Sequence, residues 1–271
     1  MSIFKPVTVV TGASVGIGEA LARVFARNGH EVALVARREK EMVLLSNELA
    51  VTCKHKPHVI VADLLRTDAP ARIAHELLGR GLEPAFVINN AGFGFFGTVE
   101  KTPHVVVREI FALNFEAPLF ASQLVIPMMR AQKSGHIINV GSVAGKRGLP
   151  LSGIYCATKF ALDGLTQAMR LEVEDAGIDV TLVNPAATLT EFSDHLRHGD
   201  VVGEFRSLGR VQSAQIVAAA IVRAIRNPTA EVYPYGFSRG LVWINAAVPS
   251  LTDRLVKRAL KDRIRAAKAS T

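Results

Sequence analysis

Tyr155 and Lys159 are the residues whose types and spacing most directly suggest chemistry. They lie four positions apart in the mostly apolar segment SGIYCATKFALDG, residues 152–164. Positions four apart are neighbours on a helix, and a cation beside a phenol lowers its pKa from the free value of about 10. We therefore predict that Lys159 prepares Tyr155 as a general acid or base near neutral pH. The alternative is an amphipathic helix that exposes both side chains.

Two more polar residues extend this predicted catalytic group. Ser142 ends the apolar run HIINVGS, thirteen residues before Tyr155, and its hydroxyl can hold a substrate carbonyl oxygen beside the phenol. Asn114 lies within FALNFEAP, inside a long apolar helical pattern. Its amide can interrupt that helix locally and hold a water that passes protons to Lys159. The alternative for Asn114 is a polar residue that faces solvent.

Apolar runs that alternate with helical patterns indicate how these residues are positioned. The runs are residues 7–10, 31–36, 58–63, 85–90, 136–142, 179–185 and 230–234; the helical patterns are residues 18–28, 39–50, 68–79, 105–131, the segment around Tyr155, and residues 213–226. Continuous apolar strands separated by helices predict a doubly wound α/β fold with a seven-stranded parallel sheet. We expect a single domain at residues 1–235. Ligands bind such sheets at the carboxyl ends of the strands, which is where every motif here lies.

Three glycines follow the first predicted strand. VVTGASVGIGEAL places Gly12, Gly16 and Gly18 in a G-x-x-x-G-x-G pattern at the start of a helix. Glycine permits a tight turn and close backbone approach, and a helix N-terminus attracts pyrophosphate. We therefore assign these glycines and Ile17 to dinucleotide binding. An ordinary glycine-rich turn is the alternative.

The end of the second predicted strand selects between the two nicotinamide dinucleotides. An acidic residue there would bind the ribose hydroxyls of NAD, but VALVARREK has no carboxylate before Glu39. A guanidinium, which is forked and permanently charged, suits a 2′-phosphate. We predict NADP(H) rather than NAD(H), with Arg37 as the main contact and Arg38 and Ser14 as weaker ones. The alternative is a solvated helix start.

The third and fourth predicted strands end in further cofactor candidates. Asp63 can accept a hydrogen bond from the adenine amino group, or it forms a turn or helix cap. The motif NNAG contains Asn90, Ala91 and Gly92, which are small enough for a ring or ribose to lie against the backbone. Asn89, the first residue of that motif, either joins this surface or ties neighbouring strands together.

These motifs together resemble the classical short-chain dehydrogenases/reductases. TGASVGIG, NNAG, Asn114, Ser142 and YCATK occur in the order and at the spacings of that family, over roughly residues 5–235, and NNAGFGFFG resembles its DltE-type branch. The resemblance implies a Rossmann-type fold, hydride transfer at nicotinamide, and an Asn114–Ser142–Tyr155–Lys159 proton relay. It also implies that Tyr155 and Lys159 contact the cofactor, and a homodimer or homotetramer formed through residues 105–131 and 153–175.

The segment after the sixth strand departs from the family pattern. The family usually has Pro-Gly there, whereas this chain has Pro185 followed by Ala186. The resemblance implies that Pro185 and Thr190 contact the nicotinamide carboxamide or the phosphates, with Thr188 as a competing candidate for the threonine. Residues 186–212 correspond to the family's substrate lid.

Aromatic and aliphatic residues near the motifs suggest a fairly hydrophobic carbonyl or alcohol substrate. Core packing is the alternative for each of them: Phe93, Phe95, Phe96, Leu149, Leu151 and Ile154. In the lid, His195 and His198 have a spacing that suits a metal, but no third ligand is evident, so we predict no metal and a solvated lid. Arg197 is a candidate contact for an acidic substrate group.

Composition narrows the functional class. The formal charge is +8, but no nucleic-acid motif accompanies the scattered basic residues, so we expect no nucleic-acid partner. The two cysteines lie outside any C-x-x-C pattern. We see no secretory pattern at the start and no uncharged run of about 18 apolar residues. These features predict a cytoplasmic protein.

Residues 236–271 form a basic extension with its own helical pattern. Leu251, Leu255, Leu260 and Ile264 make an apolar stripe, with Lys257, Arg258, Lys261 and Arg265 outside it. Packing on the body or on a second subunit is the preferred interpretation, and peripheral contact with an anionic membrane is the alternative. Two function classes therefore remain: an NADP(H)-dependent oxidoreductase, with a membrane-docked lipid-active reductase as its variant, and a non-catalytic NADP-binding sensor or scaffold.

Overall fold

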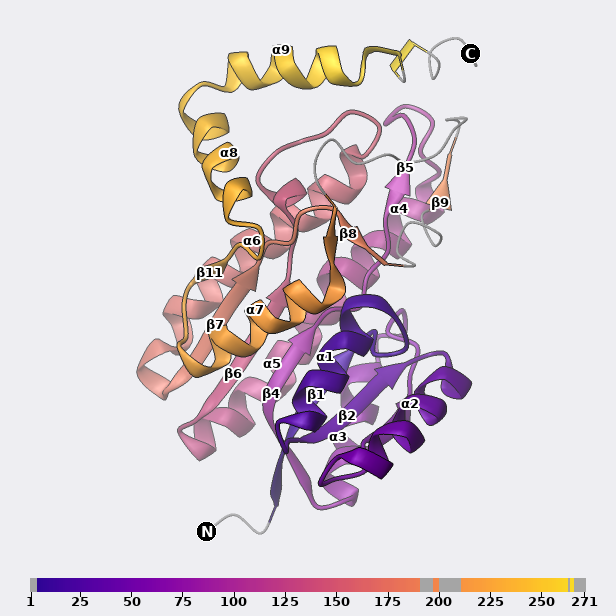
Figure 1. The fold of residues 1–271 in the computed structure, drawn as a ribbon, viewed down its shortest axis with the longest axis vertical. Coiled ribbons are helices and arrows are strands. Elements are labelled where there is room, and N and C mark those ends of the chain that lie inside the picture. The colour runs from indigo at the N-terminus through magenta and orange to yellow at the C-terminus, as the bar shows by residue number, and fades with distance from the viewer. Residues whose placement is uncertain (1–3, 191–196, 200–210, 263, 266–271) are drawn as a thin grey trace.

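Buried β-branched strands alternate with helices and assemble a parallel sheet of seven strands. The computed structural model describes residues 4–190, 197–199, 211–262 and 264–265. The strand order is β11-β7-β6-β4-β1-β2-β3, and every neighbouring pair is parallel. The bounds are β1 (Lys5–Thr11), β2 (Glu31–Ala36), β3 (His58–Val61), β4 (Leu82–Asn89), β6 (Gly135–Val140), β7 (Ile178–Val183) and β11 (Glu231–Val232). The predicted doubly wound fold is confirmed (Figure 1).

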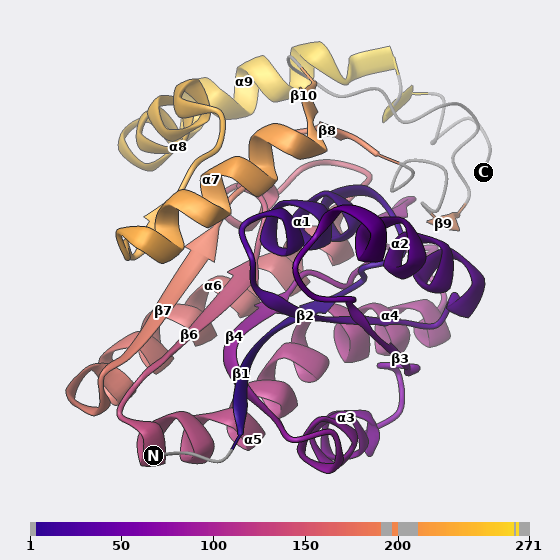
Figure 2. The ribbon, with the colours of Figure 1, turned by 60° about the horizontal axis from the view of Figure 1, so that its bottom comes forward.

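Helices cover both faces of this sheet (Figure 2). One face carries α1 (Gly16–Arg27), α2 (Glu39–Thr52) and α7 (Ala214–Arg226); the other carries α3 (Ala69–Gly79), α5 (Ala117–Gln132) and α6 (Gly153–Val173). Phe25, Met42 and Ile221 pack in the first layer, and Met129 and Met169 pack in the second. Two hydrophobic cores therefore hold the strands between them.

The helix predicted at residues 105–131 is divided. It consists of α4 (His104–Phe111), a π-helical turn η1 (Ala112–Glu116), and α5. The interruption falls at Asn114, as its amide suggested, and π-helical turns are frequent at functional sites. By length and composition His104–Gln132 is apolar enough to cross a membrane, but Val125 and Met129 pack on the sheet as core residues.

Several short elements border the carboxyl edge of the sheet. They are β5 (Phe95–Phe96), which pairs with β9 (Arg197–His198), β8 (Thr188–Leu189), which pairs with β10 (Gln212–Ser213), and the 3₁₀ turn η2 (Val143–Gly145). A second 3₁₀ turn, η3 (Glu174–Ala176), lies at the opposite edge, where it leads from α6 into β7. After β11 the chain forms α8 (Gly236–Ala247) and α9 (Pro249–Ala259), which lie at the end of the molecule opposite the N-terminus (Figure 1).

Candidate active site

The turn η2 brings Ser142 against the helix that carries Tyr155. Ser142 follows β6, and its hydroxyl accepts from the Ala144 amide at 3.1 Å, which fixes the start of the turn. Gly145 then packs so closely on α6 that a Cβ there would lie 2.8 Å from the Lys159 carbonyl oxygen. The Ser142 hydroxyl is hydrogen-bonded to the Tyr155 side chain. Ser142 and Tyr155, which the sequence predicts to act together, are therefore in contact.

Tyr155 and Lys159 lie on the same side of α6, but the pKa of Tyr155 is raised, whereas the sequence predicts that it is lowered. The ammonium of Lys159 is 5.8 Å from the centroid of the Tyr155 ring and donates to the Val140 carbonyl oxygen at 2.8 Å. Burial raises the pKa of Tyr155 to about 12, and the bond to Ser142 lowers it only in part. Burial also lowers the pKa of Lys159 to about 8. In the chain alone, burial is the dominant influence on the Tyr155 pKa, so the phenol is protonated at neutral pH.

Asn114 is buried and joins two segments of the site. Its side-chain oxygen accepts from the Phe93 amide at 3.0 Å, and its side-chain nitrogen donates to the Phe93 carbonyl oxygen at 3.0 Å and to the Thr158 hydroxyl at 3.1 Å. The solvent-facing alternative is therefore wrong. Gly92 lies between Asn114 and Lys159, because a Cβ there would be 2.9 Å from the amide oxygen and 3.9 Å from the ammonium.

The glycine turn has the backbone that its sequence predicts. Gly12 and Gly16 adopt φ of +66° and +61°, which favours glycine, and a Cβ on Gly18 would lie 2.1 Å from the Gly12 carbonyl oxygen. Among the described residues, no side chain caps the first turn of α1, whose amide groups are suited to a phosphate. Ser14 and Ile17 are half-buried beside it. These features fit the pyrophosphate of a dinucleotide.

The residues after β2, β3 and β4 differ in how they can meet a cofactor. Arg37 is exposed and Arg38 is half-buried directly after β2. One carboxylate oxygen of Asp63 accepts from the Leu65 amide at 3.1 Å, so the turn role is present. The Asn90 side chain donates to the Thr11 carbonyl oxygen at 2.9 Å, so it faces β1.

Thr11 is a supporting residue that sequence reasoning missed. Its hydroxyl accepts from the amides of Asn90 and Ala91 at 2.9 and 3.0 Å and donates to the Ile88 carbonyl oxygen at 3.2 Å. Thr158 was also missed, and its hydroxyl accepts a hydrogen bond from the side-chain amide of Asn114. The available signal was a hydroxyl residue inside each recognised motif.

A chain of buried side-chain hydrogen bonds ties the sheet to the catalytic helix. Asn89 donates to Asn139 at 2.9 Å, Asn139 donates to Thr166 at 2.9 Å, and Thr166 donates to the Leu162 carbonyl oxygen at 2.6 Å. Of the two roles considered for Asn89, the structure contains the strand-tying one. This chain fixes α6, and hence Tyr155, relative to β4 and β6.

The segment after β7 holds the two threonine candidates differently. Pro185 accepts from the Val143 amide at 3.1 Å and so joins this segment to η2. Thr188 donates to the Ala186 carbonyl oxygen at 2.9 Å and accepts from Gln212 at 3.3 Å. Thr190 instead lies against the glycine turn, where a Cβ on Gly16 would be 3.1 Å from the Thr190 Cβ.

Apolar side chains border the Tyr155 side of the site. Phe95 packs in a cluster that includes Phe93, Ile154 and Tyr155, and Phe96 packs on Leu151. Leu151 has φ of +66°, a strained conformation for a branched side chain. The Arg197 guanidinium stacks 4.5 Å from the Phe93 ring centroid and pairs with Glu109, so the structure gives this arginine partners within the chain. His195 lies outside the described residues, and His198 lies in β9.

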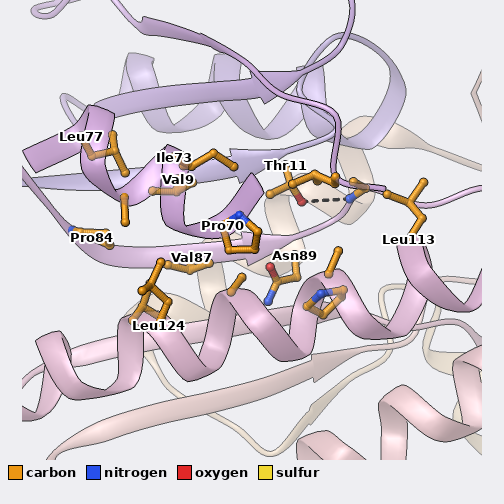
Figure 3. Close-up of a pocket in the computed structure, with 17 residues that line it drawn as sticks. Val9, Thr11, Pro70, Ile73, Leu77, Pro84, Val87, Asn89, Leu113 and Leu124 are labelled. Carbon is orange, nitrogen blue, oxygen red and sulfur yellow. Dashed lines mark hydrogen bonds between the residues drawn. The ribbon is translucent and has the colours of Figure 1, made fainter. Parts of the chain in front are cut away.

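A small apolar cavity of about 40 Å³ lies between α3 and α5 (Figure 3). Its apolar lining includes Ile73, Leu77, Val87 and Leu124, and Thr11 and Asn89 lie at one end. None of its lining side chains is ionisable. It therefore offers no acid–base chemistry, unlike the group around Tyr155.

Comparisons with known proteins point in the same direction as this geometry. A family model described as short chain dehydrogenase matches residues 6–200. Dehydrogenase/reductase SDR family member 7B of Xenopus laevis is 30% identical, over 96% of this chain and 83% of that protein.

Two solved structures are also similar. The short-chain dehydrogenase from Sphingobium yanoikuyae in complex with NADPH has a TM-score of 0.78 at 28% identity, over 92% of this chain and 96% of that one. The bulky-bulky ketone specific alcohol dehydrogenase from Comamonas testosteroni has a TM-score of 0.74 at 28% identity, over 91% and 94%.

Proposed function

We propose a specific reaction for this chain, which belongs to the short-chain dehydrogenase family and is an oxidoreductase with a nicotinamide cofactor. The reaction is hydride transfer between NADP(H) and a carbonyl or secondary alcohol. The observation that carries the proposal is the contact of Ser142 with Tyr155, with the ammonium of Lys159 held behind the phenol. When bound, the nicotinamide supplies or accepts the hydride.

Each residue of the group has a distinct task in carbonyl reduction. Ser142 and Tyr155 together hold the carbonyl oxygen, and Tyr155 gives it a proton; in alcohol oxidation the proton moves the other way. A phenol with a pKa raised to about 12 is fully protonated at neutral pH, which suits donation. Lys159 stabilises the phenolate that remains and binds the cofactor ribose. Asn114 supports this arrangement and holds the relay water.

The cofactor-binding edge favours NADP(H) over NAD(H). Arg37 and Arg38 follow β2 where an acidic residue would be needed for the ribose hydroxyls of NAD. We assign the 2′-phosphate to Arg37, with Arg38 and Ser14 beside it. Thr190 is assigned to the phosphates in preference to Thr188, because Thr190 lies against Gly16. The similar Sphingobium structure contains NADPH, which supports this choice.

We propose a bulky, apolar ketone or its alcohol as substrate. The apolar wall of Phe95, Phe96 and Leu151 beside Tyr155 supports this class. The similar Comamonas enzyme is itself described as specific for bulky-bulky ketones, which also supports this class. A second part of the proposal is a homodimer or homotetramer through α5 and α6, since α6 exposes 46% of Phe160 and 68% of Leu171.

The test is a panel of ketones and alcohols incubated with NADPH or NADH and followed by the absorbance of the reduced cofactor. We expect bulky ketones to consume NADPH with the native chain and not with Tyr155→Phe. Tight NADPH binding by calorimetry without turnover of any member of the panel would instead favour the non-catalytic sensor or scaffold.

A further inference from the structure

The two C-terminal helices carry a continuous apolar stripe that the described residues leave uncovered. On α8 and the residue after it, Phe237, Leu241, Ile244 and Val248 are spaced four, three and four apart, so they lie on one side. Their exposed fractions are 64%, 49%, 47% and 46%. Leu251 and Leu255 extend the exposed set onto α9 at 47% and 58%. We name these six residues the apolar stripe.

The polar sides of the same helices hold the extension to the body. Arg147 donates to Asn245 at 2.5 Å, to the Thr252 hydroxyl at 3.0 Å and to Asp253 at 2.5 Å. Asn245 in turn donates to the Lys146 carbonyl oxygen at 3.2 Å. Of the stripe predicted to pack on the body, Leu260 is buried, whereas Leu251 and Leu255 are exposed. The extension is thus anchored by polar groups and turns apolar ones outward.

Positive charge concentrates in the same segment. Residues 236–271 contain eight lysines and arginines and two aspartates, which gives six of the eight net charges of the chain. Arg254 and Arg258 are exposed and lie three residues beyond Leu251 and Leu255, so they share the outward side of α9. On α8, the Arg239 guanidinium stacks 5.2 Å from the exposed Trp243 ring.

We propose that α8 and α9 dock on an anionic lipid bilayer through the apolar stripe and its flanking arginines. An amphipathic helix of this kind lies in the interface, with apolar side chains at the acyl boundary and cations at the headgroups. A second copy of the chain is the less suitable occupant, because it would bring another extension of the same positive charge against the first.

Docking would also place at the bilayer a groove that borders the start of α6. This groove of about 480 Å³ lies between α9 and the loop that precedes α6. Val256 and Lys257 line one side, and Leu149 and Gly153 line the other, with Gly153 two residues before Tyr155. This consequence alone rests on the proposed function, since an apolar ketone could then enter from the membrane.

The test is co-sedimentation of the full chain with phosphatidylcholine vesicles and with vesicles that also contain phosphatidylglycerol. We expect pelleting with the anionic vesicles, little with phosphatidylcholine alone, and release as salt rises. Arg254→Glu with Arg258→Glu should weaken binding on the order of tenfold or more. Lys54→Glu with Lys56→Glu, a matched reversal of exposed cations far from α8 and α9, should leave it unchanged. Leu241→Ser with Ile244→Ser should weaken it as well.

Three outcomes would overturn the proposal. Failure to pellet with anionic vesicles would remove it, and equal loss of binding in both charge-reversal variants would reduce it to general attraction by a basic protein. The third outcome is self-association of the protein in the absence of vesicles. If Leu241→Ser with Ile244→Ser abolished that self-association, the apolar stripe would be an interface between copies of the chain. Thermal unfolding of each variant controls for folding, and vesicle binding is measured without substrate, so an inactive protein still tests it.

Discussion

The ammonium of Lys159 donates to the main-chain oxygen of Val140 at 2.8 Å while it lies 5.8 Å from the centroid of the Tyr155 ring. The carbonyl of the last residue of β6 thus holds the cation beside the phenol without a direct contact. Burial dominates the pKa of Tyr155 and raises it to about 12. In the proposed reaction these two groups have separate tasks: Tyr155 is to carry the proton and Lys159 the compensating charge.

Replacing the phenol is the direct test of proton transfer. Tyr155→Phe keeps the ring in its cluster but removes the hydroxyl that contacts Ser142. We expect kcat for ketone reduction to fall by about 10²–10⁴-fold with NADPH affinity nearly unchanged. Steady-state kinetics and calorimetric titration of NADPH measure both quantities. Full activity in this variant would assign the proton to another group.

The lowered pKa of Lys159 predicts an alkaline limb in the reduction rate. Lys159 loses its proton as pH rises through about 8, and the phenolate that forms at Tyr155 then lacks its cation. The kcat/KM for the ketone should therefore decrease above about pH 8. In Lys159→Arg the guanidinium stays charged, so the limb should move to higher pH. An unchanged limb in that variant would trace it to a different residue.

Arg37 should set the choice of cofactor. It is exposed directly after β2, and charge-assisted hydrogen bonds to a phosphate contribute about 1.5–3 kcal/mol. Arg37→Ala should lower the ratio of kcat/KM for NADPH to that for NADH by about 10- to 100-fold. Lys40→Ala removes an exposed cation three residues later and is the matched control. Equal effects of the two variants would mean that only general charge matters.

The tight approach of η2 to α6 makes Gly145 a positioning residue. A Cβ there would lie 2.8 Å from the Lys159 carbonyl oxygen, so Gly145→Ala should push Ser142 away from Tyr155. We expect kcat to fall by about 10- to 100-fold, since small misplacements at a reacting centre are costly. Gly164→Ala is the matched control on α6, because a Cβ there would have no described atom within 4 Å. This variant should stabilise the fold by about 0.5–1 kcal/mol and keep activity. Comparable kinetics for both variants would contradict this role.

Buried His136 predicts a loss of stability in mild acid. Burial lowers its pKa from 6.5 to about 4 in the folded state, where it contacts the Thr181 hydroxyl at 2.9 Å. The unfolded chain then binds more protons between these values, so the free energy of unfolding falls as pH falls from about 6.5 to 4, by about 3 kcal/mol in total. Denaturant unfolding across this range measures it, and nuclear magnetic resonance of the His136 ring reports its protonation. A His136 ring that titrates near 6.5 would refute the assignment.

The sequence carries enough information for the sheet and for the residues around Tyr155. Continuous apolar runs predict all seven strands of the sheet to within a few residues, because strands buried on both faces need such runs. The two-residue strands β5 and β9 were not predicted, since two residues have no periodicity. The direction of the Asn90 side chain and the pKa of Tyr155 depend on neighbours far apart in sequence, Thr11 and Ser142. Such close approaches exist only in the folded chain.

The chain of hydrogen bonds from Asn89 through Asn139 to Thr166 has a consequence for divergence among related genes. It locks the proton-handling helix to the sheet, whereas Phe96 and Leu151 come from connections that it does not include. Loop positions accept replacement more readily than the elements they join. If the proposed roles hold, descendants of this scaffold can change which molecules they accept while they inherit the same catalytic group.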